Sequence, residues 1–207
     1  MCFSAQASFG ASLVLLVIGI LAIYKNKDTK TRLFAWIPVL FGVQQFCEGV
    51  VWIAKTDQAF SLYAQIASYG FLFFAYILWP VFLPLTVYLM ETEERKKRCL
   101  ASFLGIGAVV SSGLLWIMIQ NGIVVEVSCN HIAYFIGMPD IFHYWSLFWY
   151  FMATIVPFLI VSKKYMRHFG FVITVSAAAS LFVYSYYFTS VWCFFAALIS
   201  TAVYCLI

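Results

Sequence analysis

The sequence predicts an all-α, polytopic membrane protein built as one bundle of seven transmembrane helices. Charged residues make up 10% of the 207 residues and hydrophobic residues 65%, whereas a soluble domain carries about 25% charged residues. The chain therefore lacks the polar surface that a water-exposed globule needs. Its apolar residues also gather in runs of about 20, the length that crosses a bilayer as a helix. We expect lipid to surround most of the chain.

Seven apolar segments have the length of a membrane-spanning helix. They are approximately 8–24, 33–54, 60–90, 100–120, 144–161, 169–188 and 189–207. In the third segment, Pro80 and Pro84 should cause a kink, because proline removes a backbone donor and clashes with the preceding turn. The last two segments form one apolar stretch that is too long for a single helix. We expect a tight turn within residues 184–192, since Tyr and Trp concentrate at membrane interfaces.

Basic residues mark one side of the membrane. Eleven of the twelve Lys and Arg residues follow the first, third and fifth segments, and Lys55 alone falls on the other side. Connections rich in Lys and Arg stay in the cytoplasm, so we expect the N-terminus outside and the C-terminus in the cytoplasm. Because the basic residues are scattered over short loops, the formal charge of +4 does not indicate a nucleic-acid partner.

The longest connection, residues 121–143, is expected on the extracytoplasmic side. Within it, Glu126, Ser128 and Asn130 stand at every second position among β-branched and aromatic residues. This alternation predicts a short strand or hairpin covering the outer face, and an irregular loop is the alternative. In either case residues 1–207 form one domain.

Glu48 is the one charged residue that cannot be assigned to a loop or a segment end. A carboxyl group at such depth is costly and marks a functional site by default. Gln44, Glu48 and Trp52 share one helix face, and Gln45 adjoins its edge. Glu48 lies roughly 9 Å from the outer end of its helix. The stripe predicts a protonatable or cation-binding group at the floor of an outward-facing pocket; a structural carboxyl that fixes helix packing is the alternative.

Further polar and aromatic residues are expected at the same level of the membrane. They are Cys2, Ser4, His131, Ser190, Trp192 and Cys193. Trp52 and Trp192 would wall the pocket. Cys, His and Glu side chains can bind metal ions, but the chain has neither C-x-x-C nor H-x-x-x-H spacing. We therefore expect no metal site.

Other chemistries of seven-helix proteins and of cysteine were weighed against the same residues. A retinal protein needs a lysine in its last span, and no Lys follows Lys164. Seven-span metal hydrolases use several histidines inside the spans, whereas all three histidines here fall in loops or at segment ends. Cys2, Ser190 or Cys193 could serve as a nucleophile, but no base stands at a recognisable spacing. Cys2 and Cys129 would form a disulfide in an oxidising compartment, and free thiols are the alternative.

Four motifs extend over much of the chain: MCFSAQASF at 1–9, QQFCEGVVW at 44–52, WP at 79–80 and SVWCFFAA at 190–197. They resemble the signatures of an uncharacterised family of small bacterial integral membrane proteins that open with M-C-F-S-A-x-A-S-F, a domain of unknown function. The resemblance implies a bacterial multi-pass protein and no particular activity. It also implies a set of motif residues in this chain, namely Cys2, Ser4, Gln44, Gln45, Glu48, Trp52, Trp79, Ser190, Trp192 and Cys193.

The leading hypothesis is a protein of the bacterial cytoplasmic membrane that binds or translocates a small ligand or cation. Glu48 would be the titratable or cation-coordinating group, and Gln44 and Gln45 would orient it. One alternative is an intramembrane hydrolase acting on a lipid-like substrate, and another is a non-catalytic subunit or assembly factor. The sequence leaves the ligand, any cofactor and the oligomeric state open.

Overall fold

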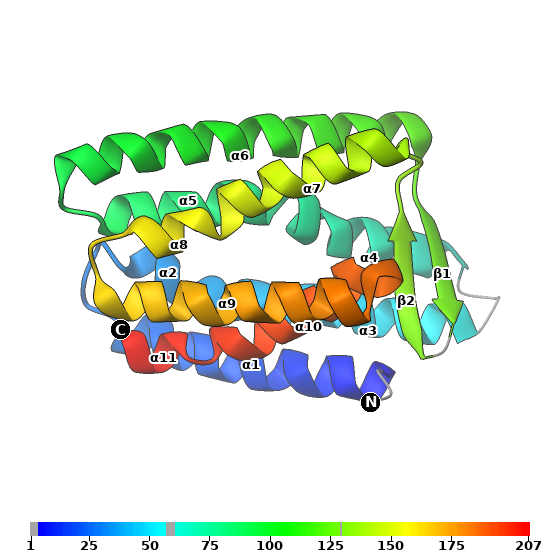
Figure 1. The fold of residues 1–207 in the computed structure, drawn as a ribbon. Helices are drawn as coiled ribbons and strands as arrows, with labels where there is room; N and C mark the ends of the chain where they lie inside the picture. Colours follow the sequence, from blue (N-terminus) through cyan, green and yellow to red (C-terminus); the bar gives the residue numbers. More distant parts are fainter. Residues whose placement is uncertain (1–3, 57–60, 129) are drawn as a thin grey trace.

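The computed structural model describes residues 4–56, 61–128 and 130–207, and it is a bundle of long helices closed at one end by a hairpin (Figure 1). Seven helical spans are long and apolar enough to cross a membrane. They are Ala5–Lys25, Arg32–Ala54, Leu62–Met90, Glu94–Asn121, Ile141–Ile160, Lys164–Val183 and Ser185–Leu206. The predicted number of spans is thus confirmed. The sixth and seventh spans divide at Tyr184 instead of after Phe188, because the chain turns at the start of the aromatic run.

The spans contain shorter elements. The helices are α1 (Ala5–Lys25), α2 (Arg32–Ala35), α3 (Ile37–Thr56), α4 (Ser61–Leu72), α5 (Trp79–Met90), α6 (Glu94–Asn121), α7 (Asp140–Thr154), α8 (Val156–Ile160), α9 (Lys164–Val183), α10 (Phe188–Ser200) and α11 (Val203–Leu206). A π-helix, η2 (Phe73–Leu78), joins α4 to α5, and a 3-10 turn, η3 (Ser185–Tyr187), joins α9 to α10. The strands are β1 (Val124–Ser128) and β2 (His131–Phe135).

Helix α3 is the central helix of the bundle. In an 18-residue window of its span, 61% of the residues are buried inside the bundle, against at most 44% in the corresponding window of any other span. Glycines allow α1 to pack closely on α3, because a Cβ atom on Gly19 would lie 2.5 Å from the Val39 side chain. Small residues at such contacts are typical of helix packing in membranes. The polar stripe of α3 is buried inside the bundle, with Gln44, Gln45 and Glu48 at most 2% exposed.

The third span is irregular before Pro80, where the sequence predicts a kink. Residues Phe73–Leu78 form a π-helix, at whose end the backbone N–H of Trp79 donates to the Phe74 carbonyl. This wider turn leaves carbonyl groups free for side chains of neighbouring helices. Tyr150 donates to the Ala75 carbonyl at 2.6 Å and Ser111 to the Ile77 carbonyl at 2.9 Å. The break is thus held in place by α6 and α7.

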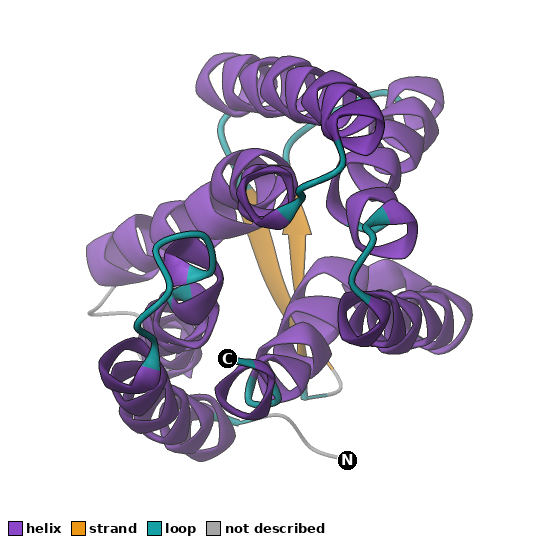
Figure 2. Ribbon diagram, turned by 90° about the vertical axis from the view of Figure 1, so that its left-hand side faces the viewer, coloured by secondary structure: helices purple, strands orange, loops and turns teal. Residues whose placement is uncertain are grey.

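Strands β1 and β2 form an antiparallel hairpin that closes one end of the bundle (Figures 1 and 2). Of the two alternatives for residues 121–143, the hairpin is confirmed. Seen from the opposite end, the strands cross the middle of the ring of helices (Figure 2). Strand β2 is buried at Ile132, Ala133 and Tyr134, whereas β1 is mostly exposed. The hairpin therefore turns β2 toward the helices.

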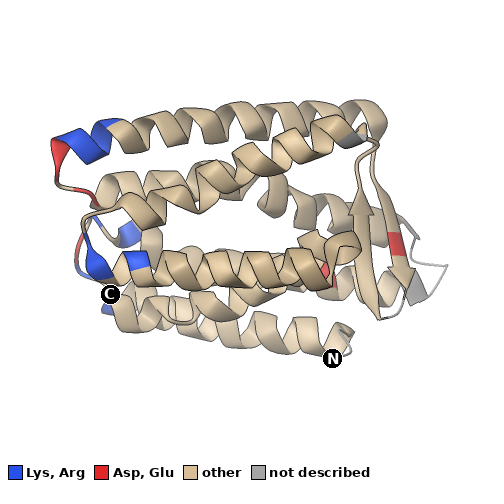
Figure 3. Cartoon of the chain, in the orientation of Figure 1, with Lys and Arg blue, Asp and Glu red and all other residues tan. Residues whose placement is uncertain are grey.

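Eleven of the twelve Lys and Arg residues gather at the other end of the bundle (Figure 3), and Lys55, near the C-terminal end of α3, is the exception. We call this the basic end; it comprises the connections α1–α2, α5–α6 and α8–α9. The opposite end, which carries β1 and β2, is the hairpin end. Helix α1 begins at the hairpin end and α11 finishes at the basic end (Figure 1), as an odd number of spans requires.

Candidate functional site

A buried polar cluster on α3 lies in the hairpin half of the bundle. The side chains of Gln44, Gln45 and Glu48 are all at most 2% exposed. The Trp79 indole N–H donates to Gln44 Oε1 at 2.8 Å. Burying three such groups in apolar surroundings is costly unless partners or a ligand satisfy them. The helical spacing predicted this shared face, and the structure brings Trp79 to it from the broken third span.

Helix α10, near the C-terminal end of the chain, contacts this cluster. The Ser190 hydroxyl donates a short hydrogen bond to Glu48 Oε1. Cys193 stands one turn further along α10, and it is buried like Ser190. Residues 142 positions apart are thereby joined, so Glu48 and the start of the last span, which the sequence placed at a similar level, are in contact.

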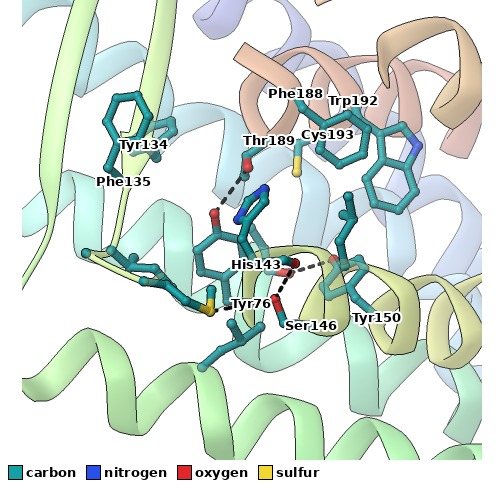
Figure 4. Close-up of a pocket in the computed structure, with 16 residues that line it drawn as sticks. Tyr76, Tyr134, Phe135, His143, Ser146, Tyr150, Phe188, Thr189, Trp192 and Cys193 are labelled. Atoms are coloured by element: carbon teal, nitrogen blue, oxygen red, sulfur yellow. Dashed lines mark hydrogen bonds between the residues drawn. The ribbon is translucent and has the colours of Figure 1, made fainter. Parts of the chain in front are cut away.

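A cavity of about 190 Å³ lies beside this contact, between α10, α7, β2 and the irregular turn of the third span. Figure 4 shows side chains from all of these elements directed around it. Its wall includes Tyr76, Tyr134, His143, Ser146, Tyr150, Phe188, Thr189, Trp192 and Cys193. A second chamber of about 280 Å³ shares Tyr76, Tyr134, His143, Phe188 and Thr189 with it and reaches Tyr186 on η3. We call these spaces the cavity and the outer chamber.

Two residues of the cavity wall carry buried polar atoms without a hydrogen-bond partner. Within the described residues, these atoms are the Tyr134 hydroxyl and the Trp192 indole nitrogen. Buried polar groups are paired with few exceptions, and an exception suggests a missing water, ion or ligand. Burial, together with the nearby Glu48 charge, raises the pKa of Tyr134 well above its usual range. Tyr134 therefore keeps its proton at neutral pH.

The remaining predicted site residues occupy various places. Ser4 accepts from the Ala7 N–H at 3.2 Å and caps the N-terminus of α1. His131 stacks on Tyr187 of η3 with ring centroids 4.9 Å apart, and Trp52 is buried in the core. Cys2 and Cys129, and with them the predicted disulfide, lie outside the described residues. Among the predicted site residues that the structure describes, Trp192 and Cys193 line the cavity.

The position of Glu48 differs from the predicted pocket floor. Its carboxyl is not part of the cavity wall and lies behind it. There it accepts a hydrogen bond from Ser190, and the next residue in the chain, Thr189, lines the wall. The reason is the bulk of α10, since Cys193 and Thr189 stand on the cavity side of that helix. Glu48 can thus act on the cavity by its charge or by proton exchange through Ser190.

Several wall residues were not singled out from the sequence. Tyr76, Thr189 and Tyr150 carry no local signal, because apolar spans commonly contain Tyr and Thr. Tyr134 could have been found from the alternation in residues 123–135, had the pairing of the hairpin been known. Tyr76 and Thr189 are joined at 3.2 Å between their hydroxyl oxygens (Figure 4), a contact that only the folded chain reveals. Among the described residues, no three His, Cys, Asp or Glu side chains form a group able to hold a metal ion.

These features define a class: a seven-helix protein with the architecture of a multi-pass membrane protein and a cavity under a terminal hairpin. The chain belongs to the family of unknown function DUF6629, whose model matches residues 1–207. No curated protein and no solved structure matches it.

Proposed function

We propose that this protein binds a small ligand in the cavity at the hairpin end, with Glu48 as the charged or proton-exchanging group behind its wall. The observation that carries this proposal is the pair of unpaired buried polar atoms on the cavity wall, the Tyr134 hydroxyl and the Trp192 indole nitrogen. Fully satisfied polar networks stabilise a fold, whereas unsatisfied ones cost free energy. A ligand or ordered water would satisfy them.

The charge pattern supports an orientation for this site. With the basic end in the cytoplasm, as Lys and Arg in short connections favour, the cavity and the hairpin lie on the outer side. The N-terminus is then outside, the C-terminus is cytoplasmic, and residues 121–143 are extracytoplasmic. The family resemblance adds the bacterial cytoplasmic membrane as the setting.

Binding is better supported than passage through the bundle. Toward the basic end, Trp192 and Cys193 adjoin a second, smaller space of about 30 Å³, which has room for about two waters. Its other walls are mainly apolar, with Phe41, Trp79 and Phe158 among them. A polar solute would lose its hydration there without replacement.

The test is ligand screening with a blocked cavity. Purified protein in lipid nanodiscs would be heated with compounds of varied charge, and the midpoint of unfolding measured. A ligand of the cavity should raise this midpoint. Leu147→Trp, on the wall of both the cavity and the outer chamber, should abolish the response. Phe148→Trp, at a neighbouring side chain that is 52% exposed, is the matched control and should keep it.

Two outcomes would contradict the proposal. One is a wild-type protein that responds to no compound of any charge class. The other is a response that Leu147→Trp leaves unchanged although the variant folds like Phe148→Trp. The ligand would then bind elsewhere.

A further inference from the structure

We infer that the ligand of the cavity is a small organic cation, an amine or quaternary ammonium compound held by aromatic rings. This inference rests on the proposed function and names its ligand class. It follows from three observations on the described residues: the aromatic wall, the sign of the surrounding charge and the size of the space.

The wall contains six Phe, Tyr and Trp rings from four elements. They are Tyr76, Tyr134, Phe135, Tyr150, Phe188 and Trp192. The faces of aromatic rings carry negative electrostatic potential and attract cations, and cages of such rings recognise quaternary ammonium groups. Figure 4 shows Tyr76, Tyr150 and Trp192 on different sides of the space.

Hydrogen bonds and ring contacts hold these rings in place. The Tyr150 hydroxyl donates to the Ala75 carbonyl at 2.6 Å, and the Tyr76 hydroxyl meets Thr189 at 3.2 Å. Trp192 stacks on Phe188, with centroids 5.3 Å apart, and meets Tyr150 edge to face at 5.8 Å. A preformed cage loses little conformational entropy when a ligand enters.

The charges around the space favour a cation. No Lys or Arg lines the cavity or the outer chamber in the part of the chain that the structure describes. Glu48 lies behind the inner wall, where its carboxyl accepts a hydrogen bond from Ser190. At the outer chamber, Tyr186 donates to Glu126 at 2.7 Å. A cation therefore passes the Glu126 carboxylate on entry and lies near the Glu48 carboxyl group in depth, and His143 is the one basic side chain that lines both spaces.

The size of the cavity restricts the ligand further. Its volume of about 190 Å³ is below the roughly 300–1,000 Å³ of sites for drug-sized ligands. A trimethylammonium group with a short substituent is of suitable size. The unpaired Tyr134 hydroxyl and Trp192 N–H could bond a polar substituent, or the N–H groups of an amine could donate to Tyr134.

The decisive experiment compares two ligands of the same shape and different charge. Choline and its neutral isostere 3,3-dimethyl-1-butanol would be titrated against the wild-type protein in nanodiscs by calorimetry. We expect choline to bind at least about tenfold more tightly, because only the cation gains from ring faces and from Glu48. Equal affinity for the two compounds would overturn the inference.

Variants assign the effect to the cage. Trp192→Leu should weaken choline binding about tenfold or more and leave the neutral compound unchanged. Trp116→Leu, at a 66% exposed position on α6, is the control and should change neither. Tyr76→Phe keeps its ring and should retain choline binding, whereas Tyr76→Leu should not. Undiminished choline binding in both Trp192→Leu and Tyr76→Leu would contradict the cage.

The inference and the proposed function can fail separately. If screening finds a neutral or anionic ligand that Leu147→Trp blocks, and choline and tetramethylammonium do not bind, the cation cage is wrong and the binding site stands. If no compound binds in the cavity at all, both are wrong.

Discussion

Each end of the bundle buries one glutamate, and the two glutamates are treated differently. At the basic end, Glu91 is 3% exposed. It accepts hydrogen bonds from the backbone N–H groups of Thr92 at 2.7 Å, Glu93 at 2.9 Å and Ser162 at 2.8 Å. At the hairpin end, Glu48 is 2% exposed and accepts from Ser190, while Gln45 next to it has two unpaired polar atoms.

The difference separates a structural carboxyl from one near a binding site. Glu91 ties the α5–α6 connection to the α8–α9 connection with its own backbone partners, so nothing further is required. Around Glu48 the donors and acceptors are incomplete, and a cavity lies alongside. A buried polar group without a partner at the wall of a cavity is explained by a missing water, ion or ligand.

The close packing of α6 on α5 should be the feature whose disruption lowers the stability of the bundle most. A Cβ atom on Gly107 of α6 would lie 1.8 Å from the Pro80 carbonyl oxygen, so the backbone itself would have to move. We expect Gly107→Ala to lower the free energy of unfolding by about 3 kcal/mol or more, or to prevent folding. Unfolding in detergent would measure this. Gly105→Ala, where a Cβ meets nothing within 4 Å, should be tolerated; equal losses would show that the close approach is not needed.

Removing the basic-end carboxyl should have the next largest effect. Glu91→Ala leaves three backbone N–H groups without their acceptor, and we expect a loss of about 2–4 kcal/mol in the free energy of unfolding. Ligand binding at the other end should be unchanged in the folded fraction. Glu93→Ala removes an exposed pair with Lys96 at 3.2 Å and should cost at most about 1 kcal/mol. A Glu91→Ala protein as stable as Glu93→Ala would contradict the structural role of the Glu91 carboxyl.

Two buried serines test whether the hydrogen bond to Glu48 stabilises the hairpin half of the bundle. Ser190→Ala removes the donor to Glu48 and should cost about 1–3 kcal/mol, because a buried carboxyl oxygen loses its partner. Ser180 is also fully buried, but its hydroxyl has no partner. Ser180→Ala should therefore change stability by no more than about 0.5 kcal/mol, or improve it. Chemical unfolding of both variants would show whether the Ser190 bond matters beyond loss of a hydroxyl.

Acid should weaken the basic end by a smaller amount. Burial alone would raise the pKa of Glu91, but the N–H groups of Glu93, Ser162 and Thr92 outweigh it, so the pKa is lowered from 4.5. A lowered pKa means that the ionised form stabilises the folded state above pH 4.5, and this stabilisation is lost as the pH falls through the folded-state pKa. The stability gap between wild type and Glu91→Gln should narrow below pH 4.5. If the stability difference between wild type and Glu91→Gln widened on acidification, the pKa of Glu91 would not be lowered in the folded state.

The sequence predicted the spans better than the site. Hydropathy and spacing define helices one at a time, and they placed Gln44, Gln45 and Glu48 on one buried face. The cavity wall depends on which helices are neighbours. Tyr76 reaches Thr189 across 113 positions, and Tyr134 is buried because β2 faces the helices. No local pattern encodes either contact. For the same reason, α10 screens Glu48 from the cavity, although the sequence predicted it at the floor.

The most direct test of a cation-selective cavity at the hairpin end needs no known ligand. Thr189→Cys would be placed on the wall shared by the cavity and the outer chamber, in a chain whose six cysteines are replaced by alanine. Its rates of modification by methanethiosulfonates carrying a trimethylammonium or a sulfonate group would be compared. Val124→Cys, at an exposed position on β1, corrects for the intrinsic reactivity of the two reagents. We expect a corrected preference for the cationic reagent of at least about tenfold. Equal corrected rates, or no modification of Thr189→Cys by either reagent, would contradict the account.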